Sequence, residues 1–340
     1  MKRPFVFFPA IDYTSLYQRP QHLASLLVKR GFPVYFRNVG QVGGREPIVI
    51  DGVNTYHDWD RRPTEIDDDA IYIIYYPSFT GYRHWDKNEF VIYDCVDDFP
   101  DFEPYQEHAC NAADLIVYTN DKIKESIGKL DLIREDKPFL RLTNGVGSGF
   151  GDNVEIADEM KHIKNRYTKV LGFVGAMHYS WVDVDLLHRL ANEHPEWAIV
   201  IIGSTYAWDF RMSQAPSNLI RLGTKKYEEL ASYYRGCDVG LISFLDNQIS
   251  QGSDPIKLYE YAACEVPVVS RDLIYCKDIG QPVCYKYTNY DECVVQIKKA
   301  LDDNCQDNKA LRRYFASGNT WEKRVDKLLE KISELTWLEN

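Results

Sequence analysis

Apolar runs of strand length alternate with helical patterns along the first half of the chain. Residues 18–31 carry three leucines on one helical face and end at a glycine, which predicts a helix. The other helices predicted in this half are residues 104–113 and 121–130. The predicted strands are residues 4–10, 33–39, 48–53, 70–77, 90–96, 115–120 and 139–146. Apolar strands separated by helices indicate a parallel sheet with helices on both faces.

The same alternation restarts after residues 147–166, a stretch rich in glycine and charge that we interpret as the crossing between two domains. The strands predicted beyond it are residues 169–177, 197–204, 218–223, 238–244 and 266–270. The helices predicted beyond it are residues 184–194, 227–237, 255–264 and 320–335. Two such halves predict an α/β protein of two Rossmann-like, doubly wound parallel-sheet domains. The carboxyl ends of their strands are expected to face a central ligand cleft.

The length of the chain supports the division into two domains. One hydrophobic core rarely serves more than about 250–300 residues, and this chain has 340. We predict a first domain over residues 1–150 and a second domain over residues 165–318. The amphipathic helix near the end, about residues 320–338, is expected to pack back on the first domain.

The chain is acidic overall, with a formal net charge of −11 at pH 7. A protein that binds nucleic acid usually presents a basic face, so we expect no nucleic-acid partner. One segment departs from the overall charge, with basic residues at Lys122, Lys124, Lys129, Arg134, Lys137 and Arg141. Two interpretations of this segment are open: a patch that contacts an anionic membrane surface, or a solvated face of the protein.

The cysteines and the apolar stretches predict a cellular location. The chain has eight cysteines and no Cys-x-x-Cys pair, a usage typical of a reducing cytoplasm. Residues 1–13 lack the apolar run of a secretory signal, and no stretch approaches the roughly 20 apolar residues that span a bilayer. We therefore expect a cytoplasmic protein, at most peripheral to the inner face of the membrane.

No residue cluster indicates a metal site or a cofactor. His57 precedes Asp58, and His84 lies two residues before Asp86, but neither pair has a second ligand at metal spacing. The chain has neither a Walker A run nor a Gly-x-Ser-x-Gly motif. We expect no metal ion and no cofactor.

The motifs of the second half follow one another in a recognisable order. A strand ending at Gly175 and a strand ending at Gly203 are followed by NLIRLG, YEELASYYRGCDVGLISF and SDPIKLYEYAACEVPVVS. In this order the motifs resemble the donor-binding half of GT-B glycosyltransferases, especially bacterial enzymes that build capsule, exopolysaccharide and teichuronic-type polymers. The resemblance covers about residues 140–335, and QRPQHLA after the first strand supports it in the first half. It implies the two-domain GT-B fold.

The motif PIKLYEY can also be interpreted physically. Pro255 suits the first turn of a helix, where its missing N–H costs nothing. Lys257 and Glu260 are three residues apart and lie on one helical face. The start of the helix attracts a phosphate through its free N–H groups and its dipole. The resemblance implies that Glu260 binds the donor ribose and that Lys257 lies near the diphosphate; the alternative is a solvent-exposed Lys–Glu pair.

The chain departs from the family pattern just before this motif. Many retaining members carry a second glutamate one or two turns upstream, aimed at the donor sugar. The residues found there are Gln251, Gly252, Ser253 and Asp254. Asp254, or the backbone of Gly252 and Ser253, is a candidate to replace the glutamate. Whether the reaction retains or inverts the anomeric configuration stays open.

The loop after Gly175 reads GAMHYSWVD, and in the family it faces the donor diphosphate. A glycine at this place lets the backbone approach a ligand closely. The basic residues that many relatives place after this loop are absent, and we expect His178 to contact phosphate or sugar. Asp183 is equally well explained as the N-cap of the following helix. The remaining donor-side candidates, chosen by their positions, are Gly203, Tyr206 and Gly223.

Two groups in the first half are candidates for the acceptor side. Gln18 and Arg19 open the helix after the first strand, where positive groups can meet an anion. Asp94, Asp97 and Asp98 end another strand. An inverting enzyme needs a base to deprotonate the acceptor hydroxyl, and we choose Asp97 for it. Loop solvation and helix capping are the alternative roles of such aspartates.

Together these features predict a metal-independent glycosyltransferase. It would transfer a sugar from a UDP- or GDP-sugar to a glycan or lipid-linked acceptor in surface polysaccharide biosynthesis. The donor would dock on the second domain and the acceptor on the first, with closure about residues 145–166. Two alternatives are kept: a nucleotide-sugar epimerase or hydrolase on the same fold, and a non-catalytic nucleotide-sugar-binding protein.

Overall fold

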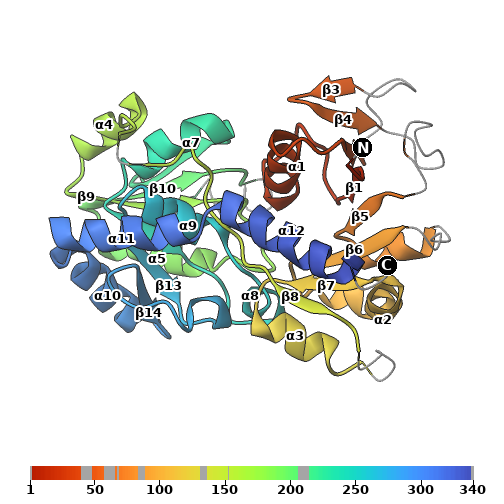
Figure 1. Cartoon of the computed structure of the whole chain (residues 1–340). Coiled ribbons are helices and arrows are strands. Elements are labelled where there is room, and N and C mark those ends of the chain that lie inside the picture. The colour runs from red at the N-terminus through yellow and green to blue at the C-terminus, as the bar shows by residue number, and fades with distance from the viewer. Residues whose placement is uncertain are drawn as a thin grey trace. The chain divides into compact units, whose positions relative to one another are not determined.

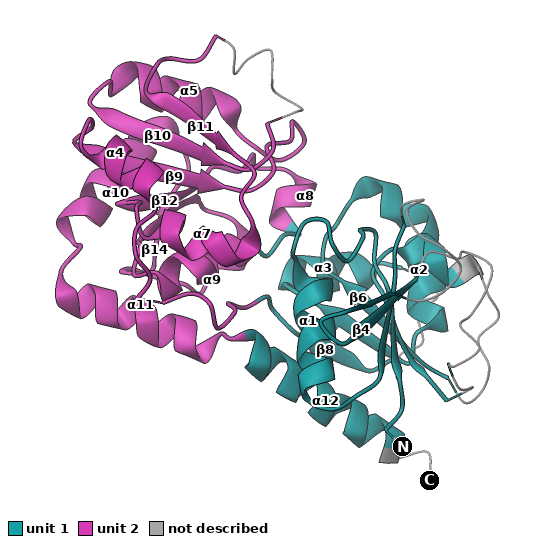
Figure 2. Cartoon of the chain, turned by 90° about the horizontal axis from the view of Figure 1, so that it is seen from above, with its two compact units in different colours: residues 1–144, 252–254, 321–340 teal, residues 145–251, 255–320 magenta. Residues whose placement is uncertain are grey.

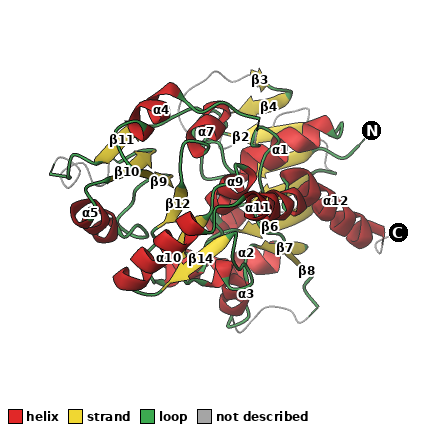
Figure 3. Ribbon diagram, turned by 90° about the vertical axis from the view of Figure 1, so that its left-hand side faces the viewer, coloured by secondary structure: helices red, strands yellow, loops and turns green. Residues whose placement is uncertain are grey.

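The computed structural model forms two compact units (Figures 1 and 2). It describes residues 2–39, 48–56, 66, 69–82, 89–130, 136–151, 153–205 and 214–337. Unit 1 comprises residues 1–144, 252–254 and 321–340, and unit 2 comprises residues 145–251 and 255–320. Strands and helices alternate along both units, as the sequence predicts (Figure 3).

Unit 1 is built on one eight-stranded sheet. Its strands are β1 Phe5–Phe8, β2 Val34–Arg37, β3 Ile48–Ile50, β4 Val53–Tyr56, β5 Ile71–Ile74, β6 Phe90–Cys95, β7 Leu115–Tyr118 and β8 Phe139–Arg141. They lie in the order β3-β4-β2-β1-β5-β6-β7-β8. All neighbours are parallel except β3 and β4, which are antiparallel.

The exception corrects one predicted strand. Residues 48–53 were expected to form a single strand, but the chain turns at Asp51 and Gly52, whose φ angles are 51° and 81°. Two successive residues with positive φ form the two-residue turn that matches the twist of a β-hairpin. The Asp-Gly pair is the sequence signal for this hairpin, and the sequence analysis did not use it.

The helices of unit 1 are α1 Arg19–Lys29, α2 Glu103–Ala112, α3 Asp121–Ile127 and α12 Trp321–Trp337, with the 3₁₀ helices η1 Pro77–Tyr82 and η2 Pro100–Phe102. The terminal helix α12 packs on α1. At its start the ring of Trp321, which is fully buried, stacks on His22 with 4.7 Å between the ring centroids. Residues 321–337 therefore belong structurally to the same unit as the N-terminal part of the chain.

Unit 2 is built on a six-stranded sheet in which all neighbours are parallel. Its strands are β9 Lys169–Val174, β10 Trp197–Ile202, β11 Leu219–Gly223, β12 Val239–Ile242, β13 Val268–Arg271 and β14 Cys284–Tyr287, in the order β11-β10-β9-β12-β13-β14. Alternate residues of β10 point into two different hydrophobic cores. Val200 and Ile202 belong to one core, and Ile199 and Ile201 belong to the other. The sheet is thus covered on both faces, which explains its nearly continuous apolar strands.

The helices of unit 2 are α4 Asp158–Lys164, α5 Val184–Glu193, α7 Tyr227–Tyr234, α8 Gln248–Gln251, α9 Ile256–Ala263, α10 Tyr290–Asp302 and α11 Gln306–Gly318, with the 3₁₀ helix η4 Ile274–Cys276. Helices α4, α10 and α11 and strand β14 were not predicted from the sequence. Helix α4 lies inside the stretch interpreted as a domain crossing, and unit 2 begins at Gly145. Only Met160 and Ile163 of α4 are buried, so its apolar face is too narrow to stand out in the sequence.

Candidate functional site

Helix α9 presents the PIKLYEY motif in unit 2. Pro255 is its N-cap residue, and the helix begins one residue later, at Ile256. The Nζ atom of Lys257 lies 3.3 Å from Oε2 of Glu260 across one helical turn. Glu260 is completely buried, whereas the Lys257 side chain is 26% exposed. The interpretation of these residues as a solvent-exposed pair is therefore wrong.

The two oxygens of the Glu260 carboxylate have different surroundings. Oε2 accepts a hydrogen bond from the hydroxyl of Tyr234 on α7, at 2.6 Å, in addition to the contact with Lys257. Oε1 is buried and has no hydrogen-bond partner among the described residues. A buried acceptor without a partner is costly, and native structures usually satisfy it with a protein group, an ordered water or a ligand. Oε1 is thus a place where a ligand hydroxyl could donate.

Tyr234 is a member of this site that the sequence analysis missed. Burial, and next the neighbouring Glu260 carboxylate, raise the pKa of Tyr234 well above its ordinary value. The phenol therefore stays protonated and donates to Glu260. No local signal marks it, because Tyr234 and Glu260 are 26 residues apart and meet only through the packing of α7 on α9.

The loop after β9 carries His178. Its ring stacks on Trp181, with centroids 4.3 Å apart, and its Nδ1 accepts a hydrogen bond from the backbone N–H of Ser180 at 3.2 Å. An accepting Nδ1 leaves the ring proton of a neutral imidazole on Nε2. His178 is partly exposed, so this Nε2–H can donate to a phosphate or sugar oxygen. The predicted role of His178 stays a prediction.

Three glycines lie at the carboxyl ends of strands of the same sheet: Gly175 and Gly203 directly follow β9 and β10, and Gly223 is the last residue of β11. Gly175, Gly203 and Gly223 have φ angles of 147°, 138° and 70°. A Cβ atom at Gly203 would lie 2.1 Å from the carbonyl oxygen of Gly175, so the packing of two backbones already explains this glycine. A Cβ at Gly223 would meet no atom within 4 Å. Tyr206, the other candidate here, lies outside the described residues.

Asp183 caps α5. Its Oδ1 accepts the backbone N–H of Leu186 at 3.0 Å, and its Oδ2 pairs with Arg271 at 2.9 Å. Both oxygens are therefore used inside unit 2. The structure supports the N-cap alternative for this residue.

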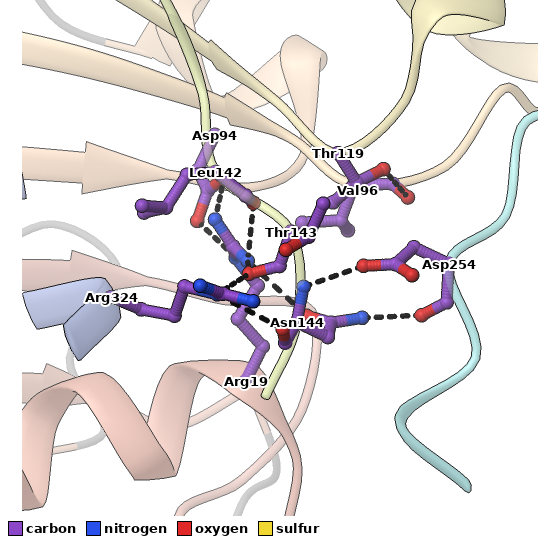
Figure 4. A network of polar contacts seen from close by, with 9 residues as sticks. All are labelled: Arg19, Asp94, Val96, Thr119, Leu142, Thr143, Asn144, Asp254 and Arg324. Atoms are coloured by element: carbon purple, nitrogen blue, oxygen red, sulfur yellow. Dashed lines mark hydrogen bonds and ion pairs between the residues drawn. The ribbon is translucent and has the colours of Figure 1, made fainter. Parts of the chain in front are cut away.

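Unit 1 holds a buried ion pair beside the start of α1 (Figure 4). Nε and Nη2 of Arg19 donate to the two carboxylate oxygens of Asp94 at 2.7 and 2.9 Å. Nη1 donates to the carbonyl of Leu142 at 3.0 Å and to Oδ1 of Asn144 at 3.2 Å. Arg19 is 3% exposed and Asp94 2%. These contacts give the Arg19 guanidinium a structural role in unit 1.

Gln18, the neighbouring acceptor-side candidate, precedes α1 as its N-cap residue. Its backbone N–H donates to Oε1 of Gln21 at 3.2 Å. Gln18 is partly exposed whereas Arg19 is buried. The prediction that Gln18 and Arg19 meet a substrate anion stays a prediction.

The carboxylates at the end of β6 differ in their partners. Asp94 binds Arg19, and Oδ2 of Asp98 accepts the hydroxyl of Ser126 at 2.8 Å. The Asp97 side chain makes neither a hydrogen bond nor an ion pair with any other residue that the structure describes. Burial raises the pKa of Asp97 to about 6, the Arg19 cation opposes this shift, and Asp254 adds to it. Asp97 can thus accept a proton near neutral pH.

Most basic side chains of the segment around α3 have acidic or carbonyl partners in the structure. Lys122 and Lys129 both contact Glu125, and Arg141 pairs with Asp121. Lys137 is buried against two backbone carbonyls of residues 111 and 113. Arg134 lies outside the described residues. These pairings favour the interpretation as a solvated face.

Among the described residues, no helix has both the length and the apolar character needed to cross a bilayer. No group of three or more histidine, cysteine, aspartate or glutamate residues among them is arranged to hold a metal ion.

Comparison with known proteins agrees with this architecture. Residues 168–303 match the family model described as glycosyl transferases group 1. Over 216 residues the chain is 24% identical to a protein of Bacillus subtilis (strain 168) named as a teichuronic acid biosynthesis glycosyltransferase, TuaH. The match covers 62% of this chain and 54% of TuaH, so the chain spans about half the length of that relative.

Solved structures resemble almost the whole chain. Sucrose-phosphate synthase from Thermosynechococcus elongatus superimposes with a TM-score of 0.77 at 11% identity, covering 99% of this chain and 100% of that chain. HepE of Anabaena, in complex with UDP and glucose, superimposes with a TM-score of 0.68 at 11% identity, covering 97% and 99%. These likenesses confirm the predicted GT-B fold.

The glycines yield a graded prediction for stability. We expect Gly203→Ala to lower the free energy of unfolding by more than about 2 kcal/mol, because the new methyl group meets the Gly175 backbone. Gly223→Ala should cost about 1–2 kcal/mol, for its positive φ alone. Gly280→Ala is the control, since Gly280 lies in open space, and should stay within about 0.5 kcal/mol. Denaturant titration measures the series, and equal losses at Gly203 and Gly280 would contradict it.

Because the pKa of Asp97 is raised, we expect Asp97→Asn to increase the free energy of unfolding by an amount that depends on pH. The carboxyl of Asp97 titrates at about 6 when folded, against an ordinary value of 3.8. Asp97 therefore costs nothing well below its ordinary pKa of 3.8, where it is protonated in both states, and its full cost is present above pH 6. At pH 7 the variant should be more stable by about 1–3 kcal/mol. Denaturation at about pH 3 and about pH 7 tests this, and an equal difference at both values would contradict it.

Proposed function

We propose that this chain, a GT-B protein whose residues 168–303 form a group 1 glycosyl transferase domain, is a glycosyltransferase. In this proposal it transfers a sugar from a nucleotide-sugar donor to a glycan or lipid-linked acceptor in surface polysaccharide biosynthesis. The protein acts on the cytoplasmic side of the membrane. The match to the family model and the likeness to a teichuronic acid glycosyltransferase support the assignment.

The buried carboxylate of Glu260 is the observation that carries the proposal. Its Oε2 is held by Tyr234 and Lys257, and its buried Oε1 has no partner among the described residues. A ribose hydroxyl that donates to Oε1 would satisfy this oxygen. The donor nucleotide therefore binds to unit 2, with its ribose at Glu260. UDP is the first nucleotide to test, because a structure with the same fold contains UDP and glucose.

The donor diphosphate is neutralised by protein groups in this proposal. Lys257 supplies a partly exposed ammonium one residue inside α9, and the first N–H groups of that helix point toward its N-terminal end. The Nε2–H of His178 supplies a further donor. No metal ion or cofactor is required by this scheme, and activity in the presence of a chelator tests that part of it.

Unit 1 supplies the acceptor side, and Asp97 is the proposed base. Its carboxylate accepts the proton of the acceptor hydroxyl while the oxygen of that hydroxyl attacks the anomeric carbon and the nucleotide leaves. A base with a pKa near the working pH is the most effective, and the pKa of Asp97 is raised to about 6. Such a reaction inverts the anomeric configuration.

The first experiment is calorimetric titration with UDP, GDP and ADP, for the wild type and for Glu260→Gln. In the variant, the side-chain amide oxygen can still accept the hydrogen bond from Tyr234. The position of Oε1 is taken by an NH₂ group, which donates and cannot accept a hydrogen bond from a ribose hydroxyl. We expect micromolar binding of one nucleotide by the wild type. The variant should bind it more weakly by about 1–3 kcal/mol, the loss of a charge-assisted hydrogen bond.

Glu265→Gln is the matched control. Glu265 is also a nearly buried glutamate of unit 2, five residues further along, but it pairs with Arg235 and Arg313. Its replacement should leave the nucleotide affinity of the folded protein unchanged. Equal affinity of Glu260→Gln and wild type would remove Glu260 from the site. No binding of any nucleotide by the folded wild type would overturn the proposed donor site.

The variant Asp97→Asn tests whether Asp97 acts as the catalytic base or has only a structural role. Loss of the base should lower kcat by roughly 10²–10⁴-fold, although the variant is expected to be the more stable protein. The wild-type kcat/KM should rise with pH through about 6, the pKa of Asp97. NMR of the product gives the anomeric configuration. Full activity with retained configuration would exclude Asp97 as the base, and rapid consumption of donor without acceptor would favour an epimerase or hydrolase.

A further inference from the structure

The chain enters unit 1 for three residues immediately before α9. Gln251 and Pro255 belong to unit 2, whereas Gly252, Ser253 and Asp254 group with unit 1. This is the stretch in which the sequence suggested a substitute for the missing sugar-binding glutamate. The contacts of the three residues show what they do instead.

Each of the three residues is held by unit 1. A Cβ atom at Gly252 would lie 2.3 Å from the Cβ of Asp98, so no side chain fits there. The carbonyl oxygen of Ser253 accepts a hydrogen bond from Nδ2 of Asn120 at 2.7 Å. Both residues therefore pack closely against unit 1.

Asp254 makes two hydrogen bonds with one residue. Its Oδ2 accepts the backbone N–H of Asn144 at 2.5 Å, and its carbonyl oxygen accepts Nδ2 of the same asparagine at 2.5 Å (Figure 4). Asp254 is 6% exposed and Asn144 7%. The first of these bonds is accepted by a buried carboxylate, and hydrogen bonds to a carboxylate are among the stronger ones in proteins.

Asn144 is itself fixed by two arginines. Oδ1 of Asn144 accepts Nη1 of Arg19 at 3.2 Å, and its carbonyl oxygen accepts Nε of Arg324 at 3.1 Å. Arg19 is held by Asp94, and Arg324 lies in the first turn of α12. The chain leaves unit 1 after Asn144 and after Asp254, and it returns to unit 1 at Trp321. The unit 1 residues at these three points therefore share one buried polar cluster.

We propose that Asp254 is a positioning residue that fixes the start of α9, the helix with Lys257 and Glu260, through Asn144. Pro255 follows directly, and its ring restricts both its own φ and the backbone of Asp254. An anchored Asp254 therefore holds the N-cap of α9 in place. The inference rests on the proposed function, because it assumes that α9 binds the donor.

The test compares Asp254→Ala, Asn144→Ala and the double variant, with Asp246→Ala as control. Asp246 is a carboxylate of unit 2 that binds Gln251, on the other side of the three-residue stretch. Affinity for the free nucleotide should fall several-fold for Asp254→Ala, because the helix that carries Glu260 and Lys257 is no longer fixed at its start. The kcat for transfer should fall roughly 10–100-fold, as expected for a small misplacement of reacting groups. Asp246→Ala should leave kcat unchanged.

The double variant shows whether Asp254 acts through Asn144. If it does, the double variant should lose markedly less kcat than the product of the two single losses. Multiplicative losses, or a raised donor KM with normal kcat in Asp254→Ala, would overturn the proposal in favour of a direct sugar contact. Asp254→Asn, which keeps the shape of the side chain, replaces Asp254→Ala if that variant does not fold.

Hydrogen exchange tests the anchor without any substrate. Asp254→Ala should speed exchange of the Asn144 amide and leave strands β9 and β10 unchanged. Unchanged protection of Asn144 would refute the anchor even in an active enzyme. If the wild type binds no nucleotide but this exchange responds as expected, the proposed function fails while the anchor stands.

Discussion

The ion pair between Arg19 and Asp94 is the interaction on which the arrangement of unit 1 depends. Both side chains are almost completely buried, and a buried charge is tolerated only when it is paired and hydrogen-bonded. The guanidinium obtains its partners from the end of β6 and from the backbone that follows β8. Asn144 in that backbone binds Asp254, so the stretch 252–254 is held at the same point. The need to satisfy one buried cation thus brings together stretches of chain that lie far apart in the sequence.

A second buried carboxylate in unit 2 gives the opposite case. Asp94 has partners on both oxygens, whereas Glu260 has them on one oxygen only within the part of the chain that the structure describes. Burial makes a full set of partners necessary in both places, and Glu260 obtains only part of that set from the described residues. Both groups are buried carboxylates, so residue type does not tell a structural ion pair from a ligand site. The difference is whether every oxygen of the buried group already has a hydrogen-bond partner. The same criterion separates Asp97 from Asp98 at the end of β6.

Most of the architecture could be predicted from the pattern of apolar residues. Strands buried on both faces, such as β10, leave continuous apolar runs, and α5 and α9 follow from helical periodicity. The failures have local reasons. The hairpin of β3 and β4 was hidden because two short strands and an Asp-Gly turn look like one apolar run. Helix α11 was missed because only Arg312 and Ala316 are buried among polar neighbours, so it lacks a clear apolar stripe.

The sequence by itself determined the class of fold, the order of the donor-side motifs and the choice of Glu260, Lys257 and Asp97 as candidates. The fold class follows from periodicity and Asp97 from its place at a strand end, whereas the motif order, Glu260 and Lys257 come from the resemblance to GT-B glycosyltransferases. Only the tertiary structure decided which candidates already bind other residues of the chain. The partners of Arg19 and Asp254 within unit 1 lie 75 and 110 residues away. Hydrogen-bond satisfaction depends on distances between atoms that are remote along the chain, and no local pattern encodes those distances.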